Sequence, residues 1–588
     1  MERFARLAAQ ALNTVLETPI TATDLESPPD PKMGDFGFPC FKLSKIFRKG
    51  PPQVAQEITS QLQAAAALEK VGAGMITVAA VGPYVNFTVA RDETLKALLG
   101  DILAGEGNGS YGSLTARSRG KWVLEYSSPN VAKPFNIYHL RPTALGAALD
   151  RIGRFRGYDM VGINHLGDWG TQYGKLAVAF REYGQNLPAD PSIEDLVQIY
   201  VKFHAEAETN PKLEDEARLA FLKLEQGDAE MTALWKKCVD ISMREFERLY
   251  ARLGVKFDHI WGESYYKDLL PGLLVDLKKR GLLVESEGAQ VVEVSDAEGK
   301  AMPPCIMQKT DGATIYATRD VAAALYRFEK FSFDRMTYVV GGEQRLHFQQ
   351  IFAVLRRMGA DWVSRCEHVP TGLYRFKDAK MSTRKGNFIT LDEVLELSRT
   401  KVKELMRARE AQKGEAGLSE AELDTVAEAI GVGAVVFHDL HTDPARDVEF
   451  DIDRVVDFEG ETGPYLQYAH TRCLSILRKA RESGEMPKGE LFQAGVVARL
   501  EKDEELALVK TLGQFPLHLE RTLQFGKASQ LAHYLIDVTR VFGGFYRECK
   551  VLGEAPELTR ARLMLVESTR RVLAQGLSLM GIKLPERM

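Results

Sequence analysis

Residues 125–152 read EYSSPNVAKPFNIYHLRPTALGAALDRI and connect a predicted strand to a predicted helix. The strand is the short apolar run at 122–126, and apolar residues recur at helical spacing over 145–155. Pro142 fits the first turn of this helix, where its missing N–H leaves no hydrogen bond unmade. A second strand-like run follows at 160–164. Strand, loop, helix and strand in this order predict a parallel sheet with helices on its faces.

The pattern around this stretch predicts three domains. Strand-like and helix-like segments alternate over 106–392, which predicts a Rossmann-like α/β domain with an insertion of charged helices at about 185–300. Residues 1–105 mix helices with short strands and lead into the turn-rich linker GEGNGSYG at 105–112. Nearly every segment of 393–588 has helical spacing. We therefore expect an α+β N-terminal domain, a parallel-sheet α/β domain and an all-α C-terminal domain.

The composition excludes several classes of protein. The 588 residues are 45% hydrophobic and 27% charged, which is typical of a folded globular chain and excludes wholesale disorder. The chain has 76 lysines and arginines against 81 aspartates and glutamates, so its net charge of −5 excludes a polybasic coat for nucleic acid or membrane. No apolar run approaches about eighteen residues, so we expect no membrane span. Six scattered cysteines without a C-x-x-C pair fit a reducing cytoplasm.

Some motif-like patterns carry no function. GNGSYG at 107–112 fits G-x-G-x-x-G, but it has no strand before it and no apolar-faced helix after it to aim at a pyrophosphate. The sequence has no GxxxxGK followed by serine or threonine, which argues against a P-loop nucleotidase. His438 and His441 have metal-like spacing without further ligands nearby, so we predict a surface or capping role and no metal site.

Two polar stretches, far apart in the sequence, carry the chemistry. In the first, a loop leaves the predicted strand and carries Asn130, Lys133, Asn136 and His139 to a helix start. Loops at the carboxyl ends of parallel strands bind ligands, and a helix N-terminus favours an anion. The second stretch, RFKDAKMSTRKGN at 375–387, has five cations against one carboxylate, which leaves +4. A positive charge of this size could neutralise the negative charge of a leaving pyrophosphate. Taken alone, the stretch is equally consistent with a solvent-exposed loop without a function.

Together these stretches resemble class I aminoacyl-tRNA synthetases, and specifically the arginyl-tRNA synthetase family. The family's His-x-Gly-His signature corresponds to Asn-Ile-Tyr-His at 136–139, and its Lys-Met-Ser-Lys-Ser loop to Lys-Met-Ser-Thr-Arg at 380–384. Further stretches of arginyl type are NHLGDWGTQ (164–172), YATRD (316–320) and GIKLPERM (581–588). MGDFGFP (33–39) and VGPYVNF (81–87) resemble the family's N-terminal domain, and TGPYLQYAHTR (462–472) resembles the start of its helical anticodon-binding domain. The resemblance covers essentially the whole chain.

The resemblance implies an ATP-driven reaction. The carboxylate of L-arginine attacks the α-phosphorus, pyrophosphate leaves, and the arginyl group passes from the adenylate to the 2′-hydroxyl of the terminal adenosine of arginine tRNA. The expected partners are therefore L-arginine, arginine tRNA, and ATP with Mg²⁺ as a substrate complex, with no tightly bound prosthetic group. A monomer in the cytoplasm without membrane contact is expected.

The resemblance also assigns residues that act on ATP. His139 is expected to donate a hydrogen bond to a phosphate oxygen. The cations expected to neutralise pyrophosphate are Lys133, Lys380, Arg384 and Lys385. The full set expected at the ATP site is Asn136, Tyr138, His139, Gly341, His347, Met381 and Ser382. Thr383 stands where many class I enzymes have the second lysine of the loop, which places more weight on the neighbouring cations.

The arginine site is expected to contain Asn130, Glu263, Tyr316, Asp320 and Gln344, with the carboxylate of Asp320 meeting the guanidinium. The guanidinium group of arginine is planar and has five N–H donors, so a site that binds it requires carboxylates and other acceptors in fixed geometry. Tyr316 and Asp320 share one face if YATRD begins a helix. For tRNA, the side chains expected to stack on or pair with RNA are Tyr465, Tyr468, Arg472 and Phe87. Such side chains also pack protein cores, so both interpretations stay open.

One position departs from the family pattern. The signature glycine, which lets adenine lie against bare backbone, is replaced by Tyr138. Either the site has adapted and still forms the adenylate, or the chain is an inactive paralogue that binds only tRNA or arginine. The intact arginine pocket and cationic stretch favour an active enzyme. A nucleotidyltransferase that does not act on tRNA would have no need of the helical C-terminal domain.

Overall fold

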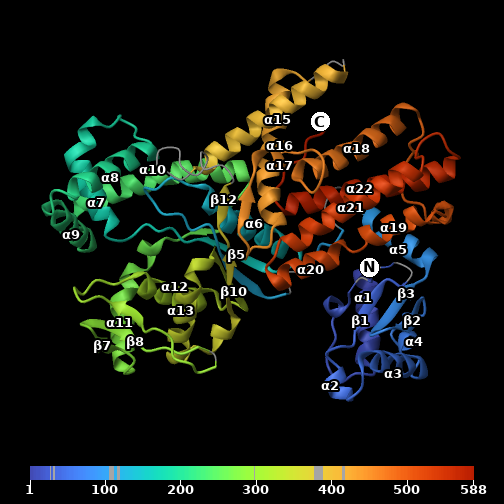
Figure 1. The fold of residues 1–588 in the computed structure, drawn as a ribbon, viewed down its shortest axis with the longest axis horizontal. Coiled ribbons are helices and arrows are strands. Elements are labelled where there is room, and N and C mark those ends of the chain that lie inside the picture. The colour runs from blue at the N-terminus through green and yellow to red at the C-terminus, as the bar shows by residue number, and fades with distance from the viewer. Residues whose placement is uncertain are drawn as a thin grey trace. The chain divides into compact units, whose positions relative to one another are not determined.

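The computed structural model describes the whole chain except Ser27, Pro29, 31–32, 105–110, 115–118, Ala297, 377–388 and 414–417 (Figure 1). The chain forms two compact units. The first unit contains 1–115, 458–579 and 584–588, and the second contains 116–457 and 580–583. The N-terminal region and the C-terminal helices therefore share one unit.

The second unit is built on a parallel sheet of five strands: β4 (Lys121–Glu125), β5 (Asp159–Asn164), β6 (His259–Ile260), β10 (Arg335–Gly341) and β11 (Cys366–Thr371). Their order is β11-β10-β4-β5-β6, so the chain runs outward from β4 on one side and then crosses to β10 on the other. The carboxyl ends of β4 and β10 flank a topological switch point, where sheets of this kind bind ligands. The prediction of a Rossmann-like parallel sheet is confirmed.

Helix α6 (Leu140–Phe155) packs closely against the sheet because two of its residues are glycines. A Cβ atom at Gly146 would lie 2.2 Å from Cβ of Tyr126, and one at Gly153 would lie 2.4 Å from Sδ of Met160. Their spacing places both glycines on nearly the same face of the helix. Helices α12 (Tyr316–Phe331) and α13 (Arg345–Arg357) share an apolar core with β4 and β10. The predicted strands and helix are thus present, with boundaries shifted by a few residues.

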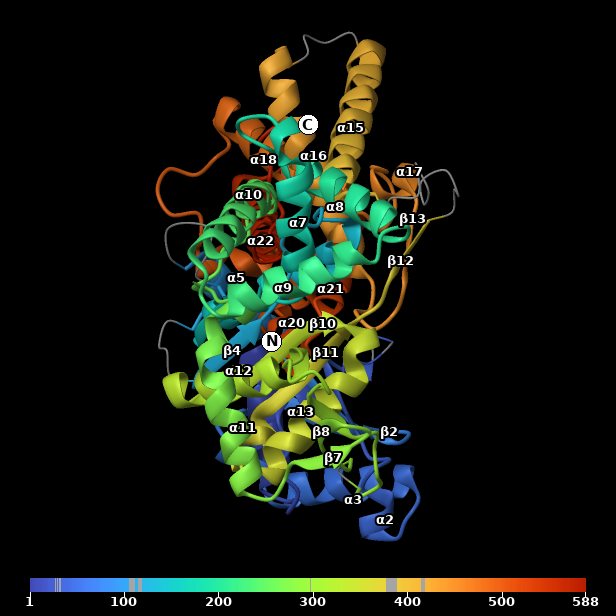
Figure 2. The ribbon, with the colours of Figure 1, turned by 90° about the vertical axis from the view of Figure 1, so that its left-hand side faces the viewer.

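The segment between β5 and β10 is mostly helical, and α7–α10 gather in one lobe in both views (Figures 1 and 2). It contains α7 (Gln172–Tyr183), α8 (Ile193–Ala207), α9 (Lys212–Glu225), α10 (Ala229–Leu253), α11 (Leu270–Lys279) and the antiparallel strands β7 (Val284–Ser286), β8 (Ala289–Val292) and β9 (Cys305–Gln308). The insertion predicted at 185–300 also contains β6, which pairs with β5 in the central sheet. A strand of two residues is too short to leave a pattern in the sequence.

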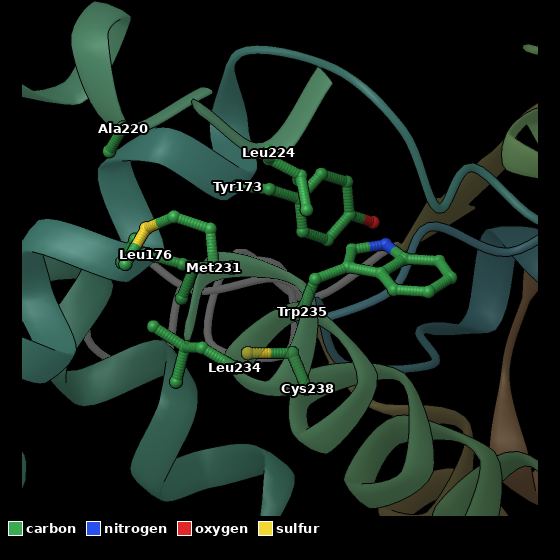
Figure 3. Close-up of a pocket in the computed structure, with 9 residues that line it drawn as sticks. Tyr173, Leu176, Ala220, Leu224, Met231, Leu234, Trp235 and Cys238 are labelled. Carbon is green, nitrogen blue, oxygen red and sulfur yellow. The ribbon is translucent and has the colours of Figure 1, made fainter. Parts of the chain in front are cut away.

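A small apolar pocket lies among α7, α9 and α10 (Figure 3). Tyr173 Oη donates to the carbonyl of Gly167 (2.7 Å), and Trp235 Nε1 donates to the carbonyl of Asp168 (2.7 Å). The two rings thereby fix the turn that follows β5. The lining has no charged group, which suits a structural role: Tyr173, Leu176, Ala177, Ala220, Leu224, Met231, Leu234, Trp235 and Cys238.

Helices beyond the sheet complete the second unit. They are α15 (Leu391–Lys413), α16 (Glu420–His441) and α17 (Ile452–Val455), with the parallel strand pair β12 (Tyr374–Phe376) and β13 (Val448–Phe450). Arg141 of α6 forms a buried ion pair with Asp439 of α16 (2.9 Å), and Tyr374 Oη donates to the same carboxylate (2.9 Å). Residues up to 457 therefore pack with the sheet, although the predicted C-terminal domain begins at 393.

The first unit joins an α+β region to a helical region, as predicted. Among its described residues, the α+β region has an antiparallel sheet of order β1-β3-β2, formed by β1 (Phe36–Pro39), β2 (Ile76–Val81) and β3 (Tyr84–Val89). Its α-helices are α1 (Glu2–Asn13), α2 (Ser44–Phe47), α3 (Pro51–Ala64), α4 (Ala67–Lys70) and α5 (Arg91–Leu103). The helical region contains α18 (Gly463–Glu482), α19 (Asp503–Leu512), α20 (Phe515–Phe525), α21 (Ser529–Glu548) and α22 (Pro556–Leu579). Within the described ranges, no helix combines the length and apolar composition that crossing a membrane requires.

Charged side chains join the two regions of the first unit. Lys510 Nζ of α19 lies 2.6 Å from Asp35 Oδ1, and Asp35 Oδ2 accepts a hydrogen bond from the Val89 amide (2.8 Å). Arg521 of α20 donates to the carbonyl of Leu25 (2.6 Å). Asp35 is only 6% exposed, so its charge depends on these partners.

Replacing Asp35 by alanine should lower the free energy of unfolding by about 1–3 kcal/mol, because the Val89 amide and the Lys510 ammonium both lose their acceptor. The urea midpoint of the first unfolding transition measures this effect. Glu17→Ala, which removes an exposed carboxylate from the same region, is the matched control and should leave the midpoint unchanged. Equal midpoints for Asp35→Ala and wild type would show that the junction does not depend on this ion pair.

Candidate active site

Several described residues that were singled out in the sequence lie on connections that leave one edge of the parallel sheet. The loop 126–139 leaves β4, the turn 165–171 leaves β5, and the turn 342–344 leaves β10. Parallel strands present their carboxyl ends at the same edge, so these three connections meet there. This edge contains the switch point between β4 and β10.

The loop after β4 has a strained backbone that its neighbours hold in place. Ser127, Ser128 and Ala132 have φ values of 75°, 48° and 58°, which L-residues seldom adopt. Ser127 Oγ hydrogen-bonds Tyr250 Oη of α10 (2.7 Å), and the Ser128 amide donates to Asn164 Oδ1 (3.2 Å). Such strain persists only where the surroundings enforce it, and it is common at functional sites.

His139 is fixed as a neutral hydrogen-bond donor. Its Nδ1 accepts from the Asn136 amide (3.2 Å), so the proton of the neutral ring lies on Nε2. Burial lowers the pKa of His139 to about 4, and the charge of Lys133 acts in the same direction. The imidazole is therefore neutral near pH 7 and can donate from Nε2. Its ring packs against Phe135 at a centroid distance of 5.0 Å.

The polypeptide that follows the second polar stretch lies against this loop. The Ile137 amide donates to the carbonyl of Ile389 (3.2 Å), and the Leu391 amide donates to the carbonyl of Phe135 (2.9 Å). Lys133 is exposed and Tyr138 is half-buried in the 3₁₀ turn that precedes α6. The remaining residues predicted to act on ATP from this stretch lie outside the described residues: Lys380, Met381, Ser382, Arg384 and Lys385.

A second cluster surrounds Asp320 in the first turns of α12. Helix α12 begins at Tyr316, so Tyr316 and Asp320 share one face, as predicted. His347 Nε2 donates to Asp320 Oδ2 (2.6 Å), and His165 Nε2 lies 3.4 Å from Asp320 Oδ1. The rings of His347 and Tyr316 are in contact at 4.8 Å. His347, predicted for the ATP site, therefore lies against the arginine-site residues Tyr316 and Asp320 in this structure.

The electrostatics of this cluster keep Asp320 ionised. Burial raises the pKa of Asp320, but its interactions with His165 and His347 outweigh burial and hold the pKa below its ordinary value. Burial lowers the pKa of His165, but Glu125 and Asp320 outweigh burial and raise it to about 9. Arg327, two turns beyond Asp320 on α12, forms a buried ion pair with Glu125. Two negative groups, Asp320 and Glu125, thus alternate with two positive groups, His165 and Arg327.

Glu263 lies near this cluster and is paired with an arginine of the chain itself. Its Oε2 is 3.0 Å from Nε of Arg319, the neighbour of Asp320. Burial raises the pKa of Glu263 to about 7, although Arg319 opposes the rise. Among the other predicted arginine-site residues, Asn130 pairs through its backbone with Gly167, and Gln344 is exposed three residues before His347.

Three family models match this chain. The model described as "tRNA synthetases class I (R), catalytic domain" matches residues 101–452, the one described as "Arginyl tRNA synthetase N terminal domain" matches 2–89, and the one described as "DALR anticodon binding domain" matches 466–588. The chain belongs to the arginyl-tRNA synthetase family.

Relatives of this synthetase extend along its whole length. A protein named "Arginine--tRNA ligase" from Exiguobacterium sp. (strain AT1b) is 42% identical over 591 residues and covers 100% of both chains. One of the same name from Clostridium perfringens is 42% identical over 566 residues, 96% of each chain. The solved arginyl-tRNA synthetase of Thermus thermophilus shares the fold with a TM-score of 0.81, at 24% identity over 100% of both chains. That of Plasmodium falciparum has a TM-score of 0.79, at 23% identity over 100% of this chain and 98% of its own. These relatives give the inactive alternative no support.

The residues of this synthetase that were predicted to bind tRNA differ in how far their side chains are exposed. Tyr465 and Tyr468 of α18 are half-buried, and the guanidinium of Arg472 lies 4.8 Å from the ring centroid of Tyr468. Phe87 is fully buried in β3, where it pairs with Phe36 of β1. A side chain with no exposed surface cannot stack on a base, so the prediction for Phe87 is wrong. Strand residues alternate between two faces, and the sequence alone did not show which face is buried.

The sequence did not reveal four charged groups of this site. His165, Arg319, Arg327 and Glu125 contact one another or the predicted arginine-site residues, although no role was predicted for them. Arg327 lies seven residues after Asp320 on α12, so the two side chains lie on nearly the same face of the helix, and Arg319 directly precedes Asp320. Glu125 is the last residue of β4 and His165 directly follows β5. Their position at the carboxyl ends of these strands is the only signal in the sequence that places them at the site.

Proposed function

We propose that this synthetase forms arginyl-adenylate from L-arginine and ATP, and transfers the arginyl group to the 2′-hydroxyl of the terminal adenosine of arginine tRNA. The observation that carries the proposal is the ionised carboxylate of Asp320, held beside Tyr316 at the sheet edge that also carries the neutral donor His139. The carboxylate of Asp320 can pair with a guanidinium, and the imidazole of His139 can donate a hydrogen bond to a phosphate oxygen.

In this proposal the arginine pocket orients the substrate by charge. Asp320 and Tyr316 receive the guanidinium, and Glu263 receives the α-amino group. Asn130 and Gln344 complete the contacts to the substrate's backbone groups. Because little covalent chemistry is asked of the protein, holding the carboxylate of arginine in line with the α-phosphorus is its main contribution.

The same proposal gives the phosphate contacts to the loop after β4 and to the second polar stretch. His139 donates from Nε2 to a phosphate oxygen, and Asn136, Tyr138 and Gly341 line the nucleotide. The cations that neutralise the leaving pyrophosphate are Lys133, Lys380, Arg384 and Lys385, with Met381 and Ser382 beside them. Mg²⁺ enters with ATP as part of the substrate. Donors aimed at charge that develops in the transition state contribute most to such a reaction.

The remaining parts of the chain receive the tRNA in this proposal. The domains at 1–105 and 393–588 bind the tRNA that the catalytic domain at 106–392 charges, and Tyr465, Tyr468 and Arg472 contact RNA bases or phosphates. Half-buried aromatic rings beside an arginine are suited to stacking on unpaired bases. The proposed synthetase acts as a monomer in the cytoplasm, where its tRNA is used.

Charging of total tRNA with each labelled amino acid, in the presence of ATP and Mg²⁺, tests the proposal. Wild type should charge arginine alone. Charging of another amino acid would overturn the proposed substrate. A protein that binds tRNA but charges nothing, and gains activity in Tyr138→Gly, would instead be the inactive paralogue whose tyrosine closes the ATP site.

The affinity for arginine should depend on pH through Glu263. Its pKa is raised to about 7, so the carboxylate that receives the α-amino group is mostly protonated at pH 6 and mostly ionised at pH 8. The KM for arginine should therefore fall by up to about tenfold as the pH rises through this range. Glu263→Gln, which cannot ionise, should have a higher KM that does not vary with pH. Parallel pH profiles for the two proteins would show that another group titrates.

A further inference from the structure

The imidazole of His347 fills the space that the arginine substrate is proposed to use. It contacts the ring of Tyr316 at 4.8 Å and donates to Asp320 Oδ2 at 2.6 Å. These are the two side chains that are proposed to receive the guanidinium. Each carboxylate oxygen can accept more than one hydrogen bond, so a guanidinium can share Oδ1 with His165, but His347 contacts both Oδ2 and the ring of Tyr316, where the guanidinium is proposed to bind.

His165 contacts the same carboxylate in a different way. It is 8% exposed, directly follows β5, and its Nδ1 lies 3.0 Å from the carbonyl of Trp261. Its Nε2 lies 3.4 Å from Asp320 Oδ1. Nδ1 also lies 3.3 Å from Nη2 of Arg327, so a rotation of His165 away from Asp320 would break its contacts with Trp261 and Arg327 as well.

His347 lacks this second attachment. It lies in the first turn of α13, and Nε2 makes the single hydrogen bond recorded for its ring among the described residues. The two positions that precede it, Arg345 and Leu346, are exposed. The side chain of His347 is 10% exposed and its ring also contacts those of Tyr316 and Phe348, so a rotation about its side-chain bonds would cost one hydrogen bond and these ring contacts.

We propose that His347 is a placeholder in the arginine pocket, bound to Asp320 while the pocket is empty and displaced by the guanidinium of the substrate, whereas His165 remains bound to Asp320 in both states. The proposal rests on the proposed function, because it needs arginine as the ligand. The placeholder keeps a partner on a carboxylate that is largely buried. It also competes with arginine, so the apparent affinity of the wild-type protein is lower than that of the open pocket.

The test is the dissociation constant of arginine, measured by calorimetry on the full chain without ATP or tRNA. His347→Ala should bind arginine roughly threefold to tenfold more tightly than wild type, because the ligand no longer displaces a hydrogen bond. Free imidazole should enter the vacated space, so adding it should weaken arginine binding to His347→Ala and leave wild type unaffected. His165→Asn should bind arginine at least about tenfold more weakly, because it loses a permanent partner of Asp320. Gln349→Ala, an exposed position on the same helix, is the matched control and should bind as wild type does.

The outcomes separate this proposal from the proposed function. If wild type binds and charges arginine but His347→Ala binds it more weakly, His347 is a direct ligand of the substrate and the placeholder is refuted. Unchanged affinity with no competition by imidazole refutes it as well. If wild type neither binds nor charges arginine, the proposed function fails and the placeholder falls with it.

Discussion

Replacing Asp320 by asparagine should lower kcat/KM for arginine by about a thousandfold. Asparagine keeps the shape of the side chain but removes the charge, so a guanidinium would enter beside His165 without a counter-charge. Removing one partner of a buried, hydrogen-bonded charge pair costs about 2–5 kcal/mol, and each 1.4 kcal/mol is tenfold. The measurement is steady-state charging of arginine tRNA over a range of arginine concentrations.

The controls for this variant separate binding from folding. Glu329→Gln removes an exposed carboxylate from the same helix and should leave kcat/KM unchanged. Asp320→Asn should keep the circular dichroism spectrum and should bind tRNA as wild type does, since its contacts lie within the arginine pocket. Normal charging by Asp320→Asn would mean that another carboxylate, such as that of Glu263, receives the guanidinium.

Local periodicity explains which parts of this pocket could be predicted. Tyr316 and Asp320 are four residues apart on one helix, so their shared face follows from the helix alone. The contact of Asp320 with His165 spans 155 residues and the contact with His347 spans 27. Both depend on which strands become neighbours in the sheet, and no spacing in the sequence records that order.

The same limit applied to the fold. Strands β4 and β5 could be predicted because a strand buried on both faces is a continuous apolar run. The two residues of β6 carry no such run, so this edge strand was assigned to an insertion. The shared unit of the N-terminal region and the C-terminal helices rests on pairs such as Asp35 and Lys510, which lie far apart in the sequence. Charged pairs of this kind look like ordinary surface residues until the fold brings them together.

Replacing His139 by alanine should lower kcat for arginyl-adenylate formation by roughly a hundredfold to a thousandfold, which is typical of losing one donor aimed at transition-state charge. The KM for arginine should change little, because the guanidinium is proposed to bind Asp320 and Tyr316 of α12, whereas His139 lies at the end of the loop after β4. Exchange of labelled pyrophosphate into ATP, with arginine and tRNA present, measures the step directly. His533→Asn, at an exposed histidine of α21, is the control and should have wild-type exchange.

The pH profile of wild type gives an independent test of the role of His139. Its pKa is lowered to about 4, so the ring loses its extra proton as the pH rises through that value and stays neutral from about pH 6 to pH 8. A neutral donor with a fixed Nε2 proton predicts no inflection in kcat from this residue over that range. An inflection near pH 6.5 that disappears in His139→Ala would mean that His139 acts as a proton-transfer group, because only a titrating imidazole changes its charge there. A loss that appeared in KM rather than in kcat would instead place His139 in ground-state binding of ATP, and the assignment of its Nε2 to transition-state charge would be wrong.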